Sequence, residues 1–241
     1  MNGTLVAILT QAMLLFGASA GFNQPSSASS SDYYDKVSTE TIQKSLNLKP
    51  GGLILLDTEF GNVSLKEYDG REIRVELKLR GTPEGISKFR FTHNFFGNQL
   101  TLKGWCENGT GPRGSCLRQV DFVIMVPRGS SYAVRATTKQ GSIDAAISGN
   151  MKGVELSTEA GSVRVELPSN LSADIDASTS GLGGVRVSPI GLFSELCPEC
   201  EVFRSDSLKV RMNGGGAAIN AYSGIGSVYF EITQAKKERP S

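Results

Sequence analysis

Apolar and polar residues alternate along most of the chain, and this alternation predicts β-strands. Apolar side chains occupy every second position in residues 122–126, 163–167 and 173–177, and their charged neighbours are Asp121, Arg164, Glu166, Asp174 and Asp176. A period of two places one set of side chains on the buried face of a sheet and the other set in solvent. Residues 38–48 could form a helix or a strand, and their content of Thr and Ser favours a strand.

Glycine punctuates these strands at a recurring spacing. The segment TKQGSI at residues 138–143 is followed by TEAGSV at 158–163, and related segments lie at 58–63 (TEFGNV), 179–187 and 223–228 (SGIGSV). Weaker glycine corners fall at 149–153 and 214–216. A period of about twenty residues with two strands and two corners is in the size range of stacked coils. The alternative is an antiparallel sandwich whose hairpin turns happen to recur.

We therefore predict an all-β fold, built as a glycine-punctuated β-solenoid or β-roll-like stack of short strands. The domain should span about residues 37–232, with negligible helix. Loop insertions are expected near residues 95–117 and 189–207, and residues 233–241 form a charged tail.

The N-terminal residues have the character of an export signal. An apolar run over residues 5–17 precedes Ala18-Ser19-Ala20, a small-x-small cleavage site, so residues 1–20 are predicted to be a signal peptide cut after Ala20. An uncleaved membrane anchor is the rival interpretation, but the run is short for a span of about 20 residues. Residues 21–36 are rich in Ser and form a predicted linker. The mature chain should be exported, without a transmembrane span.

Two segments carry a family resemblance. The sequence LNLKPGGLILLDTEFGNVSL at residues 46–65 resembles the opening of the bacterial "putative-adhesin" domain, and YDGREIRVE at residues 68–76 resembles its next turn and strand. The later glycine corners are similar to its stacked coils. The resemblance covers roughly residues 37–232. It implies an extracytoplasmic, β-solenoid-like domain of unknown function with no known catalytic residues. The sequence departs from this pattern at the two predicted insertions, which carry all four cysteines.

Composition narrows the function classes. The chain has 25 Lys and Arg against 24 Asp and Glu, a net charge of +1, which argues against a nucleic-acid partner. It has one histidine, His93, and one tryptophan, Trp105. A three-histidine metal site is impossible, and a Ser-His or Cys-His mechanism would have to use His93. We expect His93 to be a surface or structural residue.

Carboxylates offer the remaining candidate chemistry. Asp174 and Asp176 share the outer face of one predicted strand and could bind Ca²⁺, but the surrounding spacing matches no calcium motif, and a solvated face is the simpler interpretation. A glycosidase on this scaffold would need clustered carboxylates. The available ones are Asp144, Glu155, Glu159 and Glu166. We predict no catalytic, cofactor-binding or metal residue and no cofactor.

The four cysteines are expected to form disulfides. An even count behind an export signal favours bonded cysteines, and four of them allow three pairings. We expect Cys106–Cys116, which closes a polar segment, and Cys197–Cys200. The Cys-Pro-Glu-Cys segment leaves two alternatives open, a redox-active pair and a four-thiolate zinc site.

The function predicted from these features is non-enzymatic. The chain should be an exported cell-envelope or surface protein, in the periplasm, on the cell surface or secreted, that uses a long β face to bind an envelope or surface ligand, protein or polysaccharide. The alternatives are a carbohydrate-active enzyme on a β-solenoid scaffold and a periplasmic sensing or scaffolding module.

Overall fold

A computed structural model describes residues 37–107, 116–149, 151–190 and 205–234. These residues belong to one compact unit that starts at Lys36. The predicted signal peptide, the Ser-rich linker and residues 235–241 of the tail lie outside the described residues.

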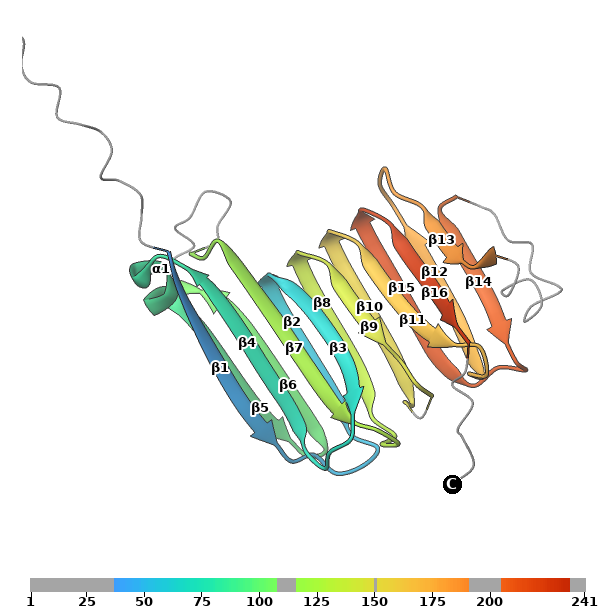
Figure 1. The fold of residues 1–241 in the computed structure, drawn as a ribbon, viewed down its shortest axis with the longest axis horizontal. Helices are drawn as coiled ribbons and strands as arrows, with labels where there is room; N and C mark the ends of the chain where they lie inside the picture. Colours follow the sequence, from blue (N-terminus) through green and yellow to red (C-terminus); the bar gives the residue numbers. More distant parts are fainter. Residues whose placement is uncertain (1–36, 108–115, 150, 191–204, 235–241) are drawn as a thin grey trace, which may run out of the picture. The chain divides into compact units, whose positions relative to one another are not determined.

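The described residues form two eight-stranded sheets and one short helix, so the all-β prediction is confirmed (Figure 1). Sheet A contains, in spatial order, β1 (Ser38–Leu46), β4 (Ile73–Gly81), β7 (Gln119–Pro127), β3 (Asn62–Tyr68), β9 (Ile143–Ala146), β11 (Val163–Pro168), β16 (Val228–Thr233) and β13 (Val185–Ser188). Sheet B contains β14 (Ser207–Met212), β12 (Ala173–Thr179), β15 (Ala217–Ile225), β10 (Gly153–Ala160), β8 (Ala133–Gln140), β2 (Leu53–Phe60), β6 (Gln99–Cys106) and β5 (Phe89–Phe96).

The middle of each sheet is parallel, and the chain passes from sheet B to sheet A in successive pairs of strands. The pairs β2–β3, β6–β7, β8–β9, β10–β11, β15–β16 and β12–β13 each place one strand in each sheet, and we call each pair a coil. Neighbouring coils keep the same register in both sheets, with Gly153 beside Ala133 in sheet B and Val163 beside Ile143 in sheet A. Antiparallel strands β1, β4, β5 and β14 flank this middle part.

The coils do not stack in sequence order. Strand β15 lies between β10 and β12, and β16 lies between β11 and β13, so the last coil of the chain enters the stack before the coil that precedes it in sequence. Neither sheet closes on itself, because each one ends in two separate edge strands. A closed solenoid or roll is therefore not confirmed.

The predicted insertion at residues 95–117 is wrong for its first half, whereas residues 108–115 lie outside the described part. Residues 99–106 form β6, which buries Leu100 and Leu102 and pairs in parallel with β2. The connections from β6 to β7 and from β12 to β13 are longer than the short corners of the other coils. Of the second predicted insertion, residues 191–204 lie outside the described part.

One short helix was not expected from the sequence. Helix α1 (Pro83–Lys88) starts where the Thr82 hydroxyl accepts a hydrogen bond from the Gly85 amide at 3.0 Å, with Pro83 in its first turn. Six residues are too few to show the 3.6-residue period by which a helix is recognised.

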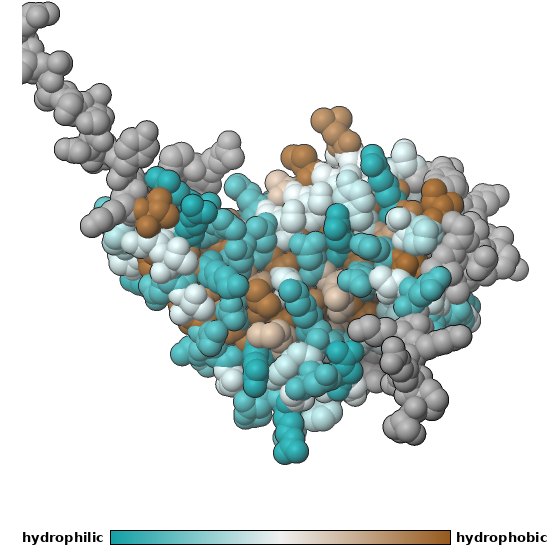
Figure 2. Space-filling view, in the orientation of Figure 1, coloured by the Kyte–Doolittle hydropathy of each residue, from teal (hydrophilic) through white to brown (hydrophobic). Residues whose placement is uncertain are grey.

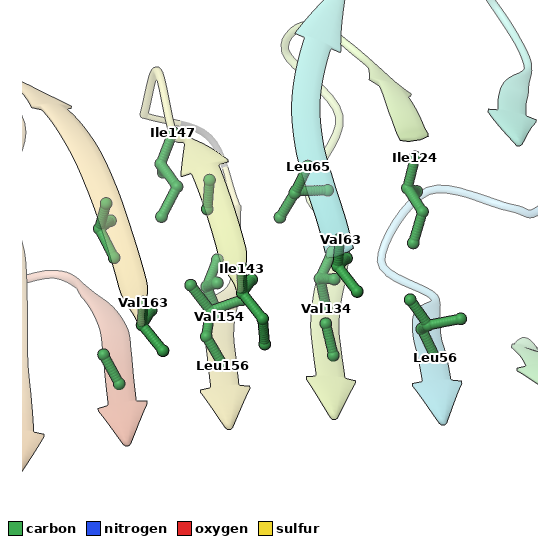
Figure 3. Close-up of a cluster of buried hydrophobic side chains, with 14 of the residues drawn as sticks. Leu56, Val63, Leu65, Ile124, Val134, Ile143, Ile147, Val154, Leu156 and Val163 are labelled. Atoms are coloured by element: carbon green, nitrogen blue, oxygen red, sulfur yellow. The ribbon is translucent and has the colours of Figure 1, made fainter. Parts of the chain in front are cut away.

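The core lies between the two sheets and takes side chains from both. In Figure 3, Leu56 of β2, Val134 of β8 and Leu156 of β10 face Val63 and Ile143 of sheet A. All five are at most 2% exposed. The apolar positions predicted from alternation in residues 122–126, 163–167 and 173–177 are all buried, which confirms those three strands. Residues 38–46 are also a strand, as predicted.

The glycine corners lie side by side along one rim, where β8, β10 and β15 end at the top of Figure 1. A Cβ added to Gly141 would lie 2.1 Å from the Gly61 carbonyl oxygen, and one added to Gly161 would lie 2.0 Å from that of Gly141. Both glycines have a positive φ, +142° and +153°. Close backbone approach and this φ together explain why each corner needs glycine.

The Thr and Ser residues of the same corners join one coil to the next. The Thr158 hydroxyl donates to the Gly141 carbonyl at 2.8 Å, and the Ser223 hydroxyl donates to the Gly161 carbonyl at the same distance. The Ser162 amide donates to the Ser142 hydroxyl at 3.3 Å. These bonds satisfy buried carbonyls that a corner would otherwise leave unpaired.

Candidate binding face

The two aspartates considered for calcium are engaged in ion pairs. On the outer face of sheet B, Asp174 accepts from Arg211 at 2.9 Å and Asp176 lies 3.2 Å from the Lys209 ammonium, both partners coming from β14. The hydrogen bond from Arg211, followed by one from the Gly216 amide, lowers the pKa of Asp174. This pairing supports the simpler interpretation of a solvated, charged face.

The other candidate carboxylates do not meet. Glu155 and Glu159 lie on the outer face of sheet B, whereas Asp144 and Glu166 lie on that of sheet A. Glu155 pairs with Arg135 at 2.6 Å. Within the described ranges, no three His, Cys, Asp or Glu side chains come together in a way that could hold a metal ion.

His93 lies on the edge strand β5, half-buried, with its ring edge-on to Phe95 at 6.3 Å between centroids. It is opposite Leu102 in the register of β5 and β6. Its surroundings are those of a packed edge-strand residue.

Cys106 and Cys116 form the expected disulfide, with their Cα atoms 5.6 Å apart. The bond lies in the connection from β6 to β7, in the position where the other coils have a glycine corner. The Cys116 amide also donates to the Cys106 sulfur at 2.9 Å. Cys197 and Cys200 lie outside the described residues, so their pairing stays a prediction, as do the zinc and redox alternatives.

Next to this disulfide, the outer face of sheet B has a shallow depression around Trp105. Its volume is about 380 Å³, and it is lined by Asp57 and Glu59 of β2 and by Lys103, Gly104, Trp105 and Cys106 of β6. Lys103 lies directly beside Asp57 in the parallel register of these strands. Trp105 is half-buried, with Arg90 of β5 as its partner on the other side.

Several polar side chains of this depression have no partner among the described residues. The Asp57 carboxylate, the Lys103 ammonium and the Trp105 indole form no side-chain hydrogen bond or ion pair within the described part. Glu59 has a long contact of 3.6 Å with Lys139. Polar groups that converge in a concave site without protein partners are typical of ligand recognition.

One sequence feature points to this site, namely the outward position of Trp105 on its strand. Leu100, Leu102 and Gly104 alternate as inward positions of β6, so Thr101, Lys103 and Trp105 must point outward. A tryptophan at an outward strand position is unusual because its large apolar surface is normally buried. The partners Asp57 and Glu59 could not be assigned, because they come from a strand more than forty residues away in sequence.

The rest of the sheet B face is flat and charge-balanced. Cross-strand ion pairs join Arg135 to Glu155 and, at the far edge, β14 to β12. The side of the molecule drawn in Figure 2 is mainly hydrophilic, with scattered hydrophobic groups. Exposed pairs of this kind contribute little stability, but they leave few unpaired charges on the rest of this face.

A second surface feature is apolar and lies at the glycine rim. In the shared register, the coil β12–β13 has one residue more in its corner than the neighbouring coil β15–β16, and Leu182 in this corner is fully exposed. A Cβ on the neighbouring Gly181 would lie 3.2 Å from the Cα of Ile225, which is also exposed. Together Leu182 and Ile225 form a small apolar rim patch.

Among the described residues, no helix has the length and apolar character needed to cross a bilayer. No protein-family model matches the sequence, and no curated protein matches it either.

Solved structures are similar in fold. A structure described as a putative cell adhesion protein from Clostridium sporogenes has a TM-score of 0.53 and 10% sequence identity, covering 82% of this chain and 100% of that one. A structure described as a putative adhesin from Parabacteroides merdae has a TM-score of 0.33 and 11% identity, covering 84% and 93%. The first similarity confirms, at the level of the fold, the resemblance that the sequence predicted.

Proposed function

We propose that the protein is an exported, adhesin-like binding domain that performs no catalysis and uses the outer face of sheet B as its binding platform. The observation that carries this proposal is the group of unpaired polar side chains beside Trp105 on a face whose other charges are mostly paired. A rigid, two-layer scaffold holds this face in place before a ligand arrives, which reduces the entropy lost on binding.

Export is supported by the Cys106–Cys116 bond, because disulfides persist in oxidising compartments. The fold shared with the cell adhesion protein of Clostridium sporogenes supports a surface role. We further interpret the six coils as a solenoid-like section flanked by antiparallel strands, a scaffold that typically presents an extended binding surface.

Adhesion under flow tests the proposal. Beads coated with the exported chain should be retained on surfaces carrying bacterial envelope, in a saturable way that free protein competes. Reversing two charges on sheet B (Arg135→Glu with Lys139→Glu) should reduce retention. The matched control reverses two charges on sheet A (Arg164→Glu with Arg186→Glu) and should leave it unchanged. Absence of saturable retention, or equal loss in both variants, would contradict the proposal.

The carbohydrate-active alternative has its own test. Release of reducing ends from any polysaccharide, abolished by Asp57→Asn or Glu59→Gln alone, would show that the protein is an enzyme. Unchanged polysaccharide together with saturable retention supports a binding role.

A further inference from the structure

We propose that the Trp105 depression is a saccharide-binding subsite that takes a neutral pyranose unit of a glycan. This inference rests on the proposed binding function and names the class of ligand and the residues that recognise it.

The first argument is the combination of groups. A pyranose ring has an apolar C–H face that packs on an aromatic ring, and hydroxyls around its edge that donate and accept hydrogen bonds. The depression supplies the Trp105 ring system, the Asp57 carboxylate as an acceptor and the Lys103 ammonium as a donor. Hydrogen bonds with charged partners are stronger than neutral ones, so two of them can orient one ring.

The second argument is that these groups have no other described partner. Asp57 and Lys103 are neighbours across β2 and β6, yet they form no ion pair, and both remain available. By contrast, Arg90 on the other side of Trp105 is bonded to Glu107 through two contacts of 2.8 and 2.7 Å. Arg90 is therefore engaged with Glu107 and does not line the depression, so the ligand's hydrogen bonds go to the Asp57 side.

The third argument is rigidity. Trp105 is followed directly by Cys106, whose disulfide to Cys116 anchors the end of β6. Strand β6 is not an edge strand, because it pairs with β2 on one side and with β5 on the other. A pre-organised aromatic ring loses little conformational entropy when a ligand binds.

The fourth argument concerns charge and size. The lining contains two carboxylates and one ammonium, and the Lys139 ammonium lies 3.6 Å from Glu59, so the charges nearly balance and no surplus of positive charge is available to hold an acidic sugar. Its volume of about 380 Å³ is near the lower end of small-ligand sites, which suits one or two sugar rings rather than a large cofactor. A neutral sugar within a longer glycan satisfies both limits.

Trp105 is the only tryptophan of the chain, so intrinsic fluorescence reports on this site directly. The oxidised, exported chain is titrated with maltohexaose, cellohexaose, chitohexaose and, as the acidic probe, hexagalacturonate. We expect a saturable change in Trp105 emission with at least one neutral hexasaccharide and weaker or no binding of the acidic one. No saturable change with any of the three neutral probes, or tighter binding of the acidic probe, would overturn the proposal.

Variants assign the contacts. Asp57→Asn keeps the fluorophore and should weaken binding about tenfold, since it removes one charge-assisted hydrogen bond. Trp105→Ala, measured by calorimetry, should abolish binding, while Tyr229→Ala on the outer face of sheet A should leave it unchanged. Circular dichroism of each variant checks that the fold is kept, and full binding by folded Trp105→Ala contradicts the site.

The two proposals fail in different ways. If beads are retained by the sheet B face while Trp105→Ala beads are retained equally and no glycan alters the fluorescence, the saccharide subsite is wrong and the binding function stands. If no surface retains the beads, the broader proposal fails.

Discussion

At the scale of single residues, glycine is required at the corner rim where a carbonyl group of the neighbouring coil leaves no space for a Cβ atom. Gly161 combines a φ of +153° with a site where a Cβ would lie 2.0 Å from the Gly141 oxygen. Gly149 has a comparable φ of +131°, but its added Cβ would meet only Leu171, at 3.6 Å. The two positions therefore separate backbone strain from steric clash.

We expect Gly161→Ala to lower the free energy of unfolding by on the order of 3 kcal/mol or more, because strain and a backbone clash act together. Gly149→Ala should lower it by about 1 kcal/mol, through strain alone. Urea denaturation of both variants measures the difference. Equal losses would mean that close approach between coils is not what requires Gly161.

Asp174 provides a prediction about pH. Its pKa is held below the ordinary value of 3.8, first by Arg211 and then by the Gly216 amide. A depressed pKa stabilises the folded state above the ordinary pKa, and this contribution is lost as the pH falls below about 4 through the folded value. Arg211→Gln should raise the pKa of Asp174 toward 3.8, as followed by NMR titration of the carboxyl carbon. Lys209→Gln, which removes the partner of Asp176, should move it much less.

At the scale of elements, the Thr and Ser hydroxyls next to the glycine corners differ from coil to coil in whether they form a hydrogen bond. The hydroxyl of Thr158 in β10 donates to Gly141, whereas the buried hydroxyl of Thr179 in β12 has no hydrogen-bond partner within the described residues. The longer corner after Thr179 explains the difference, because it shifts this coil out of the pattern of its neighbours.

We expect Thr158→Val to destabilise the fold by about 1–2 kcal/mol, since the Gly141 carbonyl would lose its donor. Thr179→Val should be neutral or slightly stabilising, because it replaces an unpaired buried hydroxyl with a methyl group. Denaturation midpoints of the two variants test this pair. If Thr179→Val lowers the free energy of unfolding more than Thr158→Val does, hydrogen bonds from these hydroxyls do not stabilise the contact between coils.

The connection from β6 to β7 depends on its disulfide rather than on a tight corner. Replacing Cys106 and Cys116 with alanine should lower the free energy of unfolding by about 3 kcal/mol, the value expected for closing a loop of this length. Replacing Cys197 and Cys200 with serine serves as the parallel variant. Urea denaturation with and without dithiothreitol measures the loss. If dithiothreitol still strongly destabilises the variant that lacks Cys106 and Cys116, then Cys197 and Cys200 also form a stabilising bond.

At the scale of the whole molecule, one hydrophobic core runs between the two sheets from the β1 end to the β14 end. Because the buried side chains are continuous, we expect the described unit to unfold in one cooperative transition. Trp105 fluorescence reports on the β5–β6 end, and far-ultraviolet circular dichroism reports on all the strands. The two denaturation curves should coincide. Two separate transitions would show that the coils unfold independently of the flanking antiparallel strands.

Local patterns predicted much of this protein. Alternation identified the strands around Phe122, Val163 and Ile175, because the pleat of a strand points successive side chains to opposite faces, and this property is local. The recurring corners predicted the glycine rim, and the polar segment between Cys106 and Cys116 predicted their bond. Helix α1 and strand β6 were missed, since the first is too short to show a period and the second lies in a region interpreted as a loop.

The spatial order of the coils and the composition of the candidate site were decided only by the tertiary structure. The sequence by itself determined that strands would form and where the chain would turn, because those properties follow from side-chain alternation and from glycine's lack of a Cβ. It did not determine that β15 would enter between β10 and β12, since parallel strands with similar patterns are interchangeable until the core packs. Nor could it bring Asp57 beside Lys103 and Trp105, because pairing between β2 and β6 depends on contacts between residues far apart in the chain.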